Sequence, residues 1–163
     1  MTGPNDDMDA NPMSVPHPAV CGWRGGWYVV PHEVTWRDLD GIGHVNNATY
    51  FSYFEWARTK YWFALHGIEN KQDLGVADLT FIVAHAQCDF RLQLSLAEKL
   101  DVCVRIGDMR TSSFDFLYEI RRRERRDLAA TGKVVVVHYS WEKNAKMVIP
   151  KELRARVERF QKG

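Results

Sequence analysis

The chain has 163 residues, a mass of 18.9 kDa and a net charge of +1, and 45% of its residues are hydrophobic. This is the size of one domain, and such a chain buries about 68–70% of its unfolded surface without a disulfide or a metal. The composition excludes a disordered chain, a collagen-like repeat and a disulfide scaffold. The balanced charge argues against nucleic-acid binding, and no apolar run is long enough to predict a membrane span.

The first 25 residues differ in composition from the rest of the chain. They contain four prolines and three aspartates, but neither the basic segment nor the apolar core of a signal peptide. We therefore predict a flexible leader over residues 1–25 and one domain over residues 26–163. Cys21, Cys88 and Cys103 form no Cys-x-x-Cys pair, so neither a disulfide framework nor a zinc site is expected. A cytoplasmic location is the expectation.

Aromatic and β-branched residues predict a strand over residues 27–36. A polar loop over residues 37–45 follows, and then a helix over residues 48–66, for which Asn46 or Asn47 is a suitable N-cap. Gly67 marks its C-terminal end. The helix must be buried over much of its circumference, because its apolar side chains are numerous and mostly aromatic. They are Tyr50, Phe51, Phe54, Ala57, Tyr61, Trp62, Phe63 and Leu65.

Four further strands are predicted after the helix. They cover roughly residues 78–91, 99–109, 112–124 and 128–141. A turn at residues 142–146 and a short helix from Pro150 to about Phe160 complete the chain. The links between these strands are short, which indicates antiparallel pairing. The predicted fold class is α+β, with a curved antiparallel sheet wrapped around one long central helix.

The densest polar cluster lies between the first strand and the long helix. It spans residues 37–47 and reads Arg-Asp-Leu-Asp-Gly-Ile-Gly-His-Val-Asn-Asn. The first N–H groups of a helix lack partners within it, and together with the helix dipole they stabilise negative charge on a carbonyl oxygen. A nearby carboxylate can attack that carbonyl or activate a water. The alternative is a well-capped helix in which Asp38 only stabilises the loop.

The segment VTWRDLDGIGHVNNATYFSYFEWART resembles the hotdog-fold thioesterases, in particular the 4-hydroxybenzoyl-CoA thioesterase-like family. The tail NAKMVIPKELRARVERF resembles the closing turn and helix of that family. The resemblance spans about residues 27–160. It implies a hotdog fold and a cofactor-free hydrolase of acyl-CoA or acyl-carrier-protein thioesters. It also implies a homodimer or homotetramer in which the pantetheine arm of the substrate runs between subunits.

The resemblance also assigns roles within the loop. Asp40, the second aspartate of the motif, matches the catalytic carboxylate of the family, which acts as nucleophile or general base. Asn47 matches the start of the family's helix, where the backbone N–H points at the thioester oxygen; some relatives carry a catalytic histidine there. His44 matches a histidine of the plant acyl-carrier-protein thioesterases, although Ile42 replaces the asparagine that those enzymes have two residues earlier.

Glu55 has two interpretations. A second branch of hotdog thioesterases uses a glutamate of the helix as its catalyst, and Glu55 is a candidate for that role. The alternative is a structural pair, since Arg58 and Thr59 follow at helical spacing.

Further side chains are predicted to bind the substrate. The resemblance implies an acyl pocket lined by Tyr50, Phe54 and Trp62. Five arginines and one glutamate make up residues 121–126, and Arg121, Arg122 and Arg123 are candidates for holding the phosphates of coenzyme A. A solvated hairpin is the alternative explanation of this run.

Two other functions are alternatives to hydrolysis. A hotdog hydratase or dehydratase needs an Asn-Pro-x-His loop, which this sequence lacks. A non-catalytic module that binds acyl thioesters would lack a carboxylate facing the helix N-terminus, and Asp40 argues against it. No spacing of histidines and carboxylates predicts a metal site.

Overall fold

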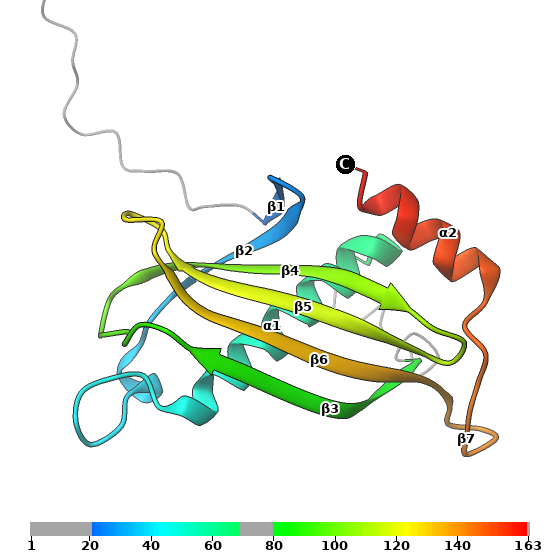
Figure 1. Cartoon of the computed structure of the whole chain (residues 1–163), viewed down its shortest axis with the longest axis horizontal. Coiled ribbons are helices and arrows are strands. Elements are labelled where there is room, and N and C mark those ends of the chain that lie inside the picture. Colours follow the sequence, from blue (N-terminus) through cyan, green and yellow to red (C-terminus); the bar gives the residue numbers. More distant parts are fainter. Residues whose placement is uncertain (1–20, 69–79, 163) are drawn as a thin grey trace, which may run out of the picture.

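The computed structural model describes residues 21–68 and 80–162 as a curved, seven-stranded antiparallel sheet with two α-helices (Figure 1). The strand order is β1-β2-β4-β5-β6-β3, and β7 pairs with β6. Every pairing is antiparallel, as the short links predict. The elements are β1 (Gly22–Arg24), β2 (Trp27–Glu33), a 3-10 turn (Trp36–Asp38), α1 (Asn47–His66), β3 (Phe81–Phe90), β4 (Lys99–Met109), β5 (Ser113–Arg122), β6 (Leu128–Ser140), β7 (Ala145–Lys146) and α2 (Lys151–Phe160).

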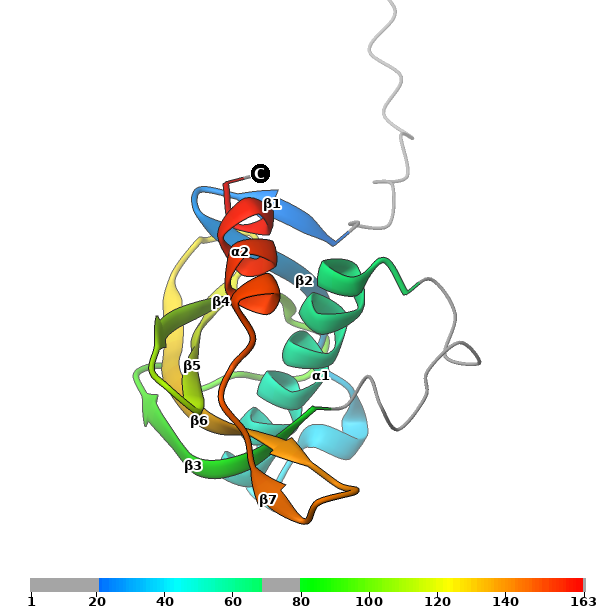
Figure 2. The same cartoon turned by 90° about the vertical axis from the view of Figure 1, so that its right-hand side faces the viewer.

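Helix α1 lies in the concave side of the sheet, which curves around it (Figure 2). Its start and end follow from local sequence. The Oδ1 atom of Asn46 accepts a hydrogen bond from the Ala48 N–H at 2.9 Å, so Asn46 is the N-cap. Gly67 adopts a left-handed conformation with φ of 67° and ends the helix. Both boundaries confirm the prediction.

The aromatic face of α1 forms the core together with the inner face of the sheet. Phe54 is completely buried and stacks on Tyr118 of β5, with ring centroids 4.3 Å apart. On β6, a Cβ atom at Gly132 would lie 2.3 Å from the Phe54 ring, so this glycine is what allows the helix to approach the sheet closely. Phe51 departs from the predicted burial, because 38% of its surface is exposed.

The folded domain begins earlier than predicted. Gly22–Arg24 is strand β1 and pairs with β2, although these residues were predicted to belong to the leader. Arg24 pairs with Trp27, which leaves Gly25 and Gly26 as a two-residue hairpin loop; their φ angles of 56° and 79° are those that such loops require. These glycines therefore form the turn between β1 and β2. The rest of the predicted leader, residues 1–20, lies outside the described residues.

Helix α2 packs beside the C-terminal part of α1 (Figure 2). The register between β4 and β5 shifts after Ile106. The Ile106 N–H instead donates to the Oε1 atom of Gln161 at 2.8 Å, and the Tyr61 hydroxyl donates to the same oxygen at 3.3 Å. Gln161, at the end of α2, thus links the helix to both the sheet and α1.

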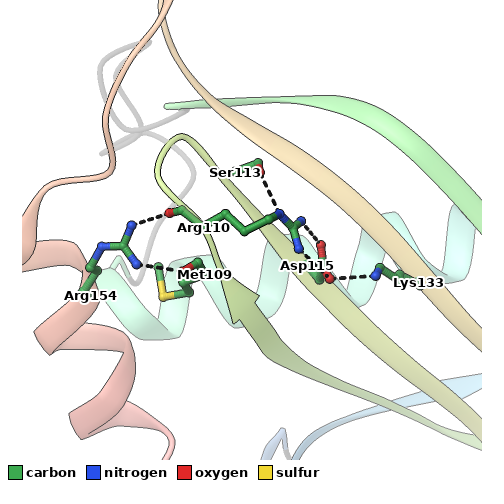
Figure 3. Close-up of polar contacts among 6 residues, drawn as sticks. All are labelled: Met109, Arg110, Ser113, Asp115, Lys133 and Arg154. Carbon is green, nitrogen blue, oxygen red and sulfur yellow. Dashed lines mark hydrogen bonds and ion pairs between the residues drawn. The ribbon is translucent and has the colours of Figure 1, made fainter.

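A second link joins α2 to the β4–β5 hairpin (Figure 3). The Arg154 guanidinium donates to the backbone carbonyls of Met109, at 2.9 Å, and Arg110. Arg110 in turn pairs with Asp115, which also contacts Lys133 at 2.7 Å. Burial opposes ionisation of Asp115, but the two cations outweigh burial and hold the pKa of this carboxyl below its usual value. The buried carboxylate is therefore fully paired and organises the hairpin.

Candidate active site

The polar loop of residues 37–47 folds back on itself before α1. The Asp40 N–H donates to the His44 carbonyl at 2.8 Å, and the Gly43 N–H donates to the Asp40 carbonyl at 3.2 Å. Gly43 has a φ of 84°, a conformation that favours glycine. Leu39 and Val45 bridge the two ends of the loop. These contacts hold Asp40 next to the start of the helix.

The two oxygens of the Asp40 carboxylate differ in their surroundings. Oδ1 accepts hydrogen bonds from the N–H groups of Ile42, at 2.9 Å, and His44, at 3.3 Å. Within the described parts of the chain, Oδ2 has no hydrogen-bond donor. One oxygen therefore fixes the orientation of the carboxylate, while the other is available to a substrate or a water.

The first turn of α1 also leaves one group without a partner. The N–H groups of Ala48 and Thr49 donate to the side chain and the carbonyl of Asn46, both at 2.9 Å. The Asn47 N–H has no acceptor among residues 21–68 and 80–162. It lies at the positive end of a 20-residue helix, where a negatively charged oxygen is stabilised.

A pocket of about 370 Å³ brings these groups together. Its volume is near the lower end for small-molecule sites. Burial raises the pKa of Tyr50 to about 12, so this phenol is neutral and donates to the Leu92 carbonyl at 3.5 Å. The pocket is lined by Asp40, Ile42, His44, Val45, Asn47, Tyr50, Phe90, Arg91, Leu92 and Gln93. The geometry thus offers an available carboxylate oxygen, a free N–H at a helix start and a partly apolar wall.

Asp38 has a different environment from Asp40. Its Oδ2 atom accepts hydrogen bonds from the N–H and the hydroxyl of Thr35, at 2.7 and 2.9 Å. Its backbone carbonyl accepts the Asn46 N–H at 2.8 Å. Asp38 does not line the pocket. It joins the segment after β2 to the start of α1, which fits the loop-stabilising interpretation.

Glu55 is exposed on α1 and does not line the pocket. The Thr59 hydroxyl donates to the backbone carbonyl of Glu55 at 2.9 Å, and Arg58 donates to the Tyr118 hydroxyl at 3.3 Å. The described residues contain no ion pair between Glu55 and Arg58. In the described chain, the Glu55 carboxylate thus neither lines the pocket, as a catalyst would, nor pairs with Arg58, as the structural interpretation expects.

The three predicted acyl-binding residues occupy two environments. Tyr50 lines the pocket beside Asp40, as the sequence analysis expects. Phe54 and Trp62 instead lie in the core, where they are 0% and 1% exposed. Phe54 stacks on Tyr118, and Trp62 stacks on Phe114 with ring centroids 6.1 Å apart. The structure therefore does not bring Phe54 and Trp62 to the wall of this pocket.

The predicted phosphate-binding arginines are engaged with carboxylates. Contact distances are 2.8 Å from Arg121 to Glu119, 3.1 Å from Arg122 to Glu98 and 2.8 Å from Arg123 to Asp101. Arg121 and Arg122 line a second pocket of about 400 Å³, separate from that of Asp40, together with Arg24, Trp27 and Arg126.

One wall of the Asp40 pocket was not predicted from the sequence. Phe90, Arg91, Leu92 and Gln93 come from the end of β3 and the segment that follows it. These residues carry no motif, and only the pairing of β3 with β6 brings them opposite α1. Within the same described ranges, no cluster of side chains is suited to a metal ion, and no helix is long and apolar enough to cross a membrane.

Residues 34–157, which include the Asp40 loop, α1 and most of the sheet, match the thioesterase-like superfamily. The chain belongs to this superfamily. It is also 35% identical over 111 residues to the uncharacterised protein YsmA of Bacillus subtilis, a match that covers 68% of this chain and 71% of YsmA. The curved antiparallel sheet around one long helix, together with membership of this superfamily, confirms the hotdog fold predicted from the sequence.

Solved structures of superfamily proteins have the same fold. A thioesterase superfamily protein from Jannaschia sp. CCS1 is 23% identical, with a TM-score of 0.72 over 85% of this chain and 86% of that one. A thioesterase from Thermus thermophilus, complexed with coenzyme A and zinc, is 27% identical, with a TM-score of 0.69 over 86% of this chain and 99% of that one.

Proposed function

We propose that this protein hydrolyses acyl-CoA thioesters, with Asp40 as nucleophile or general base and the Asn47 N–H as the group that polarises the thioester carbonyl. The observation that carries the proposal is a pocket lined by both Asp40, whose Oδ2 atom has no donor in the described chain, and Asn47, whose N–H has no acceptor there. Membership of the thioesterase-like superfamily and the coenzyme A bound to the Thermus relative support it.

The geometry is compatible with two chemical routes. In the first, Asp40 Oδ2 removes a proton from water, which attacks the thioester carbon. In the second, Oδ2 attacks the carbon itself and forms a mixed anhydride, which water then hydrolyses. Both routes place negative charge on the carbonyl oxygen, where the Asn47 N–H and the α1 dipole stabilise it, and both release the substrate thiol. His44 lines the same pocket and is the remaining candidate for handling a proton.

A thiol-release assay over short, long and aromatic acyl-CoAs tests the proposal, and acyl-carrier-protein thioesters extend it to the second carrier. We expect release of free thiol with at least one acyl class. Binding measured by calorimetry without thiol release from any thioester would identify a non-catalytic binding module instead. Addition of water to an enoyl-CoA without loss of the thioester would identify a hydratase.

We expect the protein to form a homodimer or homotetramer. Strand β3 is at the edge of the sheet, and its residues Val83 and Phe90 expose 50% and 51% of their surface. Phe51 of α1 exposes a further apolar surface, and such edges and surfaces are normally covered. Light scattering measures the mass directly. A monomer that remains fully active at micromolar concentration would contradict this prediction.

The substitution Glu55→Gln is expected to keep kcat within about twofold, because Glu55 does not line the pocket. It is also expected to change stability by less than about 0.5 kcal/mol, since the exposed carboxylate holds no ion pair in the described chain. Steady-state kinetics and thermal unfolding measure the two effects. Loss of turnover at an unchanged Tm would make Glu55 the catalyst.

Charge reversal in the basic run tests its contact with coenzyme A phosphates. Arg125 and Arg126 are exposed, so Arg125→Glu with Arg126→Glu leaves the ion pairs of the preceding three arginines in place. We expect a higher KM, a weaker dependence of KM on salt and little change in kcat. Kinetics of the double variant that equal those of the parent across a salt series would assign the exposed end of the run, Arg125 and Arg126, to a solvated hairpin.

A further inference from the structure

Arg91 introduces a positive charge into the wall of the Asp40 pocket. It follows β3 directly, and its backbone is fixed there, because the N–H groups of Arg91 and Leu92 both donate to the Ala129 carbonyl, at 2.9 and 3.1 Å. The side chain is exposed and lines the pocket. It is the one cation among the ten residues of that lining, and Asp40 is the one carboxylate.

Within residues 21–68 and 80–162, the Arg91 guanidinium has no partner, in contrast to those of Arg58, Arg122 and Arg123. Arg58 donates to a tyrosine hydroxyl, and Arg122 and Arg123 pair with carboxylates. The Arg91 side chain has no hydrogen bond, ion pair or ring contact with any residue in the described parts of the chain. Its five N–H donors are therefore available to a ligand in the pocket.

The size of the pocket limits which part of a substrate Arg91 contacts. The thioester carbon must lie near Asp40 and the Asn47 N–H for the proposed reaction. A volume of 370 Å³ holds a thioester and a short acyl group, but not the pantetheine arm and nucleotide as well. With the thioester beside Asp40, the nucleotide of coenzyme A therefore extends out of this pocket. An anion that Arg91 contacts inside the pocket belongs to the acyl group.

Asp40 makes a cation at this position chemically useful. An acyl group that bears a carboxylate is repelled by the Asp40 carboxylate in a small, partly apolar pocket. Arg91 compensates for that repulsion, and its planar fork of donors matches a carboxylate in two parallel hydrogen bonds. Gln93 lines the same wall and adds a polar amide.

We propose that Arg91 binds a carboxylate at the far end of a short acyl group, so that this protein prefers CoA thioesters of short dicarboxylic acids. The inference rests on the proposed function, because it places the thioester between Asp40 and Asn47. It makes Arg91 a residue that determines specificity rather than one that takes part in bond cleavage.

Two substrates of equal shape test the inference: glutaryl-CoA, and 5-methylhexanoyl-CoA, in which an isopropyl group replaces the carboxylate. The parent protein is expected to favour glutaryl-CoA. Arg91→Gln is expected to lower kcat/KM for glutaryl-CoA by about 10- to 100-fold and to change that for the isostere less than about twofold. Arg91→Lys, which keeps the charge but not the fork, is expected to fall between the parent and Arg91→Gln for glutaryl-CoA.

Arg105→Gln is the matched control, because it removes the same charge from β4, where Arg105 stacks on Trp27 at 4.6 Å and does not line the pocket. It is expected to leave the ratio of the two kcat/KM values unchanged. Equal losses of Arg91→Gln on both substrates would mean that Arg91 contacts the coenzyme A portion. No loss on either would mean that it is only solvated. Both outcomes would overturn the inference.

Binding separates this inference from the proposed function. Calorimetry on Asp40→Asn, with and without Arg91→Gln, measures the affinity for the two thioesters without turnover. The role of Arg91 is supported if the double variant binds glutaryl-CoA more weakly than Asp40→Asn does, while both variants bind 5-methylhexanoyl-CoA equally well. This holds even if the parent protein hydrolyses neither thioester. Equal affinity of the two variants for glutaryl-CoA overturns that role, even if hydrolysis is established with other substrates.

Discussion

Asp40→Asn is expected to lower kcat for thioester hydrolysis by at least about 10²-fold, because it removes the proposed base or nucleophile. The amide preserves the local structure. Its Oδ1 atom still accepts hydrogen bonds from the N–H groups of Ile42 and His44, and only the available Oδ2 position changes. The substitution therefore tests chemistry rather than folding. Substrate affinity is expected to stay largely unchanged, which single-turnover kinetics and calorimetry measure separately from kcat.

Asp38→Asn is the matched control for this experiment. It makes the same chemical change two residues earlier, at a carboxylate that contacts Thr35 and does not line the pocket. We expect kcat to fall by no more than about threefold, because Asp38 does not line the pocket and the asparagine oxygen can still accept the hydrogen bonds from Thr35. If Asp40→Asn retained nearly all of kcat while Asp38→Asn or Glu55→Gln did not, Asp40 would not be the catalytic carboxylate.

Asp38 and Asp40 illustrate which features of the site could be predicted from the sequence and which could not. The spacing of residues 37–47 predicts a loop over a helix N-terminus, because glycines and N-capping residues act through local backbone geometry. The same spacing does not distinguish the hydrogen-bond partners of the two aspartates. In the structure, Asp38 Oδ2 accepts two hydrogen bonds from Thr35 and Asp38 does not line the pocket, whereas Asp40 is held by the Ile42 and His44 N–H groups and lines it.

The periodicity of apolar residues correctly predicted the longer strands and the central helix, but it did not identify the residues of the pocket wall. The alternation along β4 and β5 and the helical pattern of α1 identify faces that are buried, so the sheet and the central helix were predictable. Burial alone does not separate a pocket wall from the core. Tyr50, Phe54 and Trp62 share the apolar character of α1, but only Tyr50 reaches the pocket. Likewise, a run of arginines indicates positive charge but not the carboxylates that Arg121 and its neighbours meet.

One packing contact in the core explains how closely α1 approaches the sheet. Of the substitutions considered, the one that disrupts this contact is expected to lower the free energy of unfolding most. Gly132 lies in β6 between Tyr118 of β5 and Cys88 of β3, directly beneath the Phe54 ring. A Cβ at this position would lie 2.3 Å from two ring atoms of Phe54. Phe54 has little room to move, because it is completely buried and stacked on Tyr118.

Gly132→Ala is therefore expected to lower the free energy of unfolding by about 1–3 kcal/mol, as overpacked cores do. For a domain of this size that corresponds to a decrease in Tm of roughly 2–12 °C, which thermal denaturation measures. Gly107→Ala is the matched control on β4, where the added Cβ meets the flexible end of the Leu117 side chain at 2.9 Å. Leu117 can rotate away, so a smaller decrease is expected. If both variants lost the same stability, close approach of Phe54 to Gly132 would not be what fixes the position of α1 on the sheet.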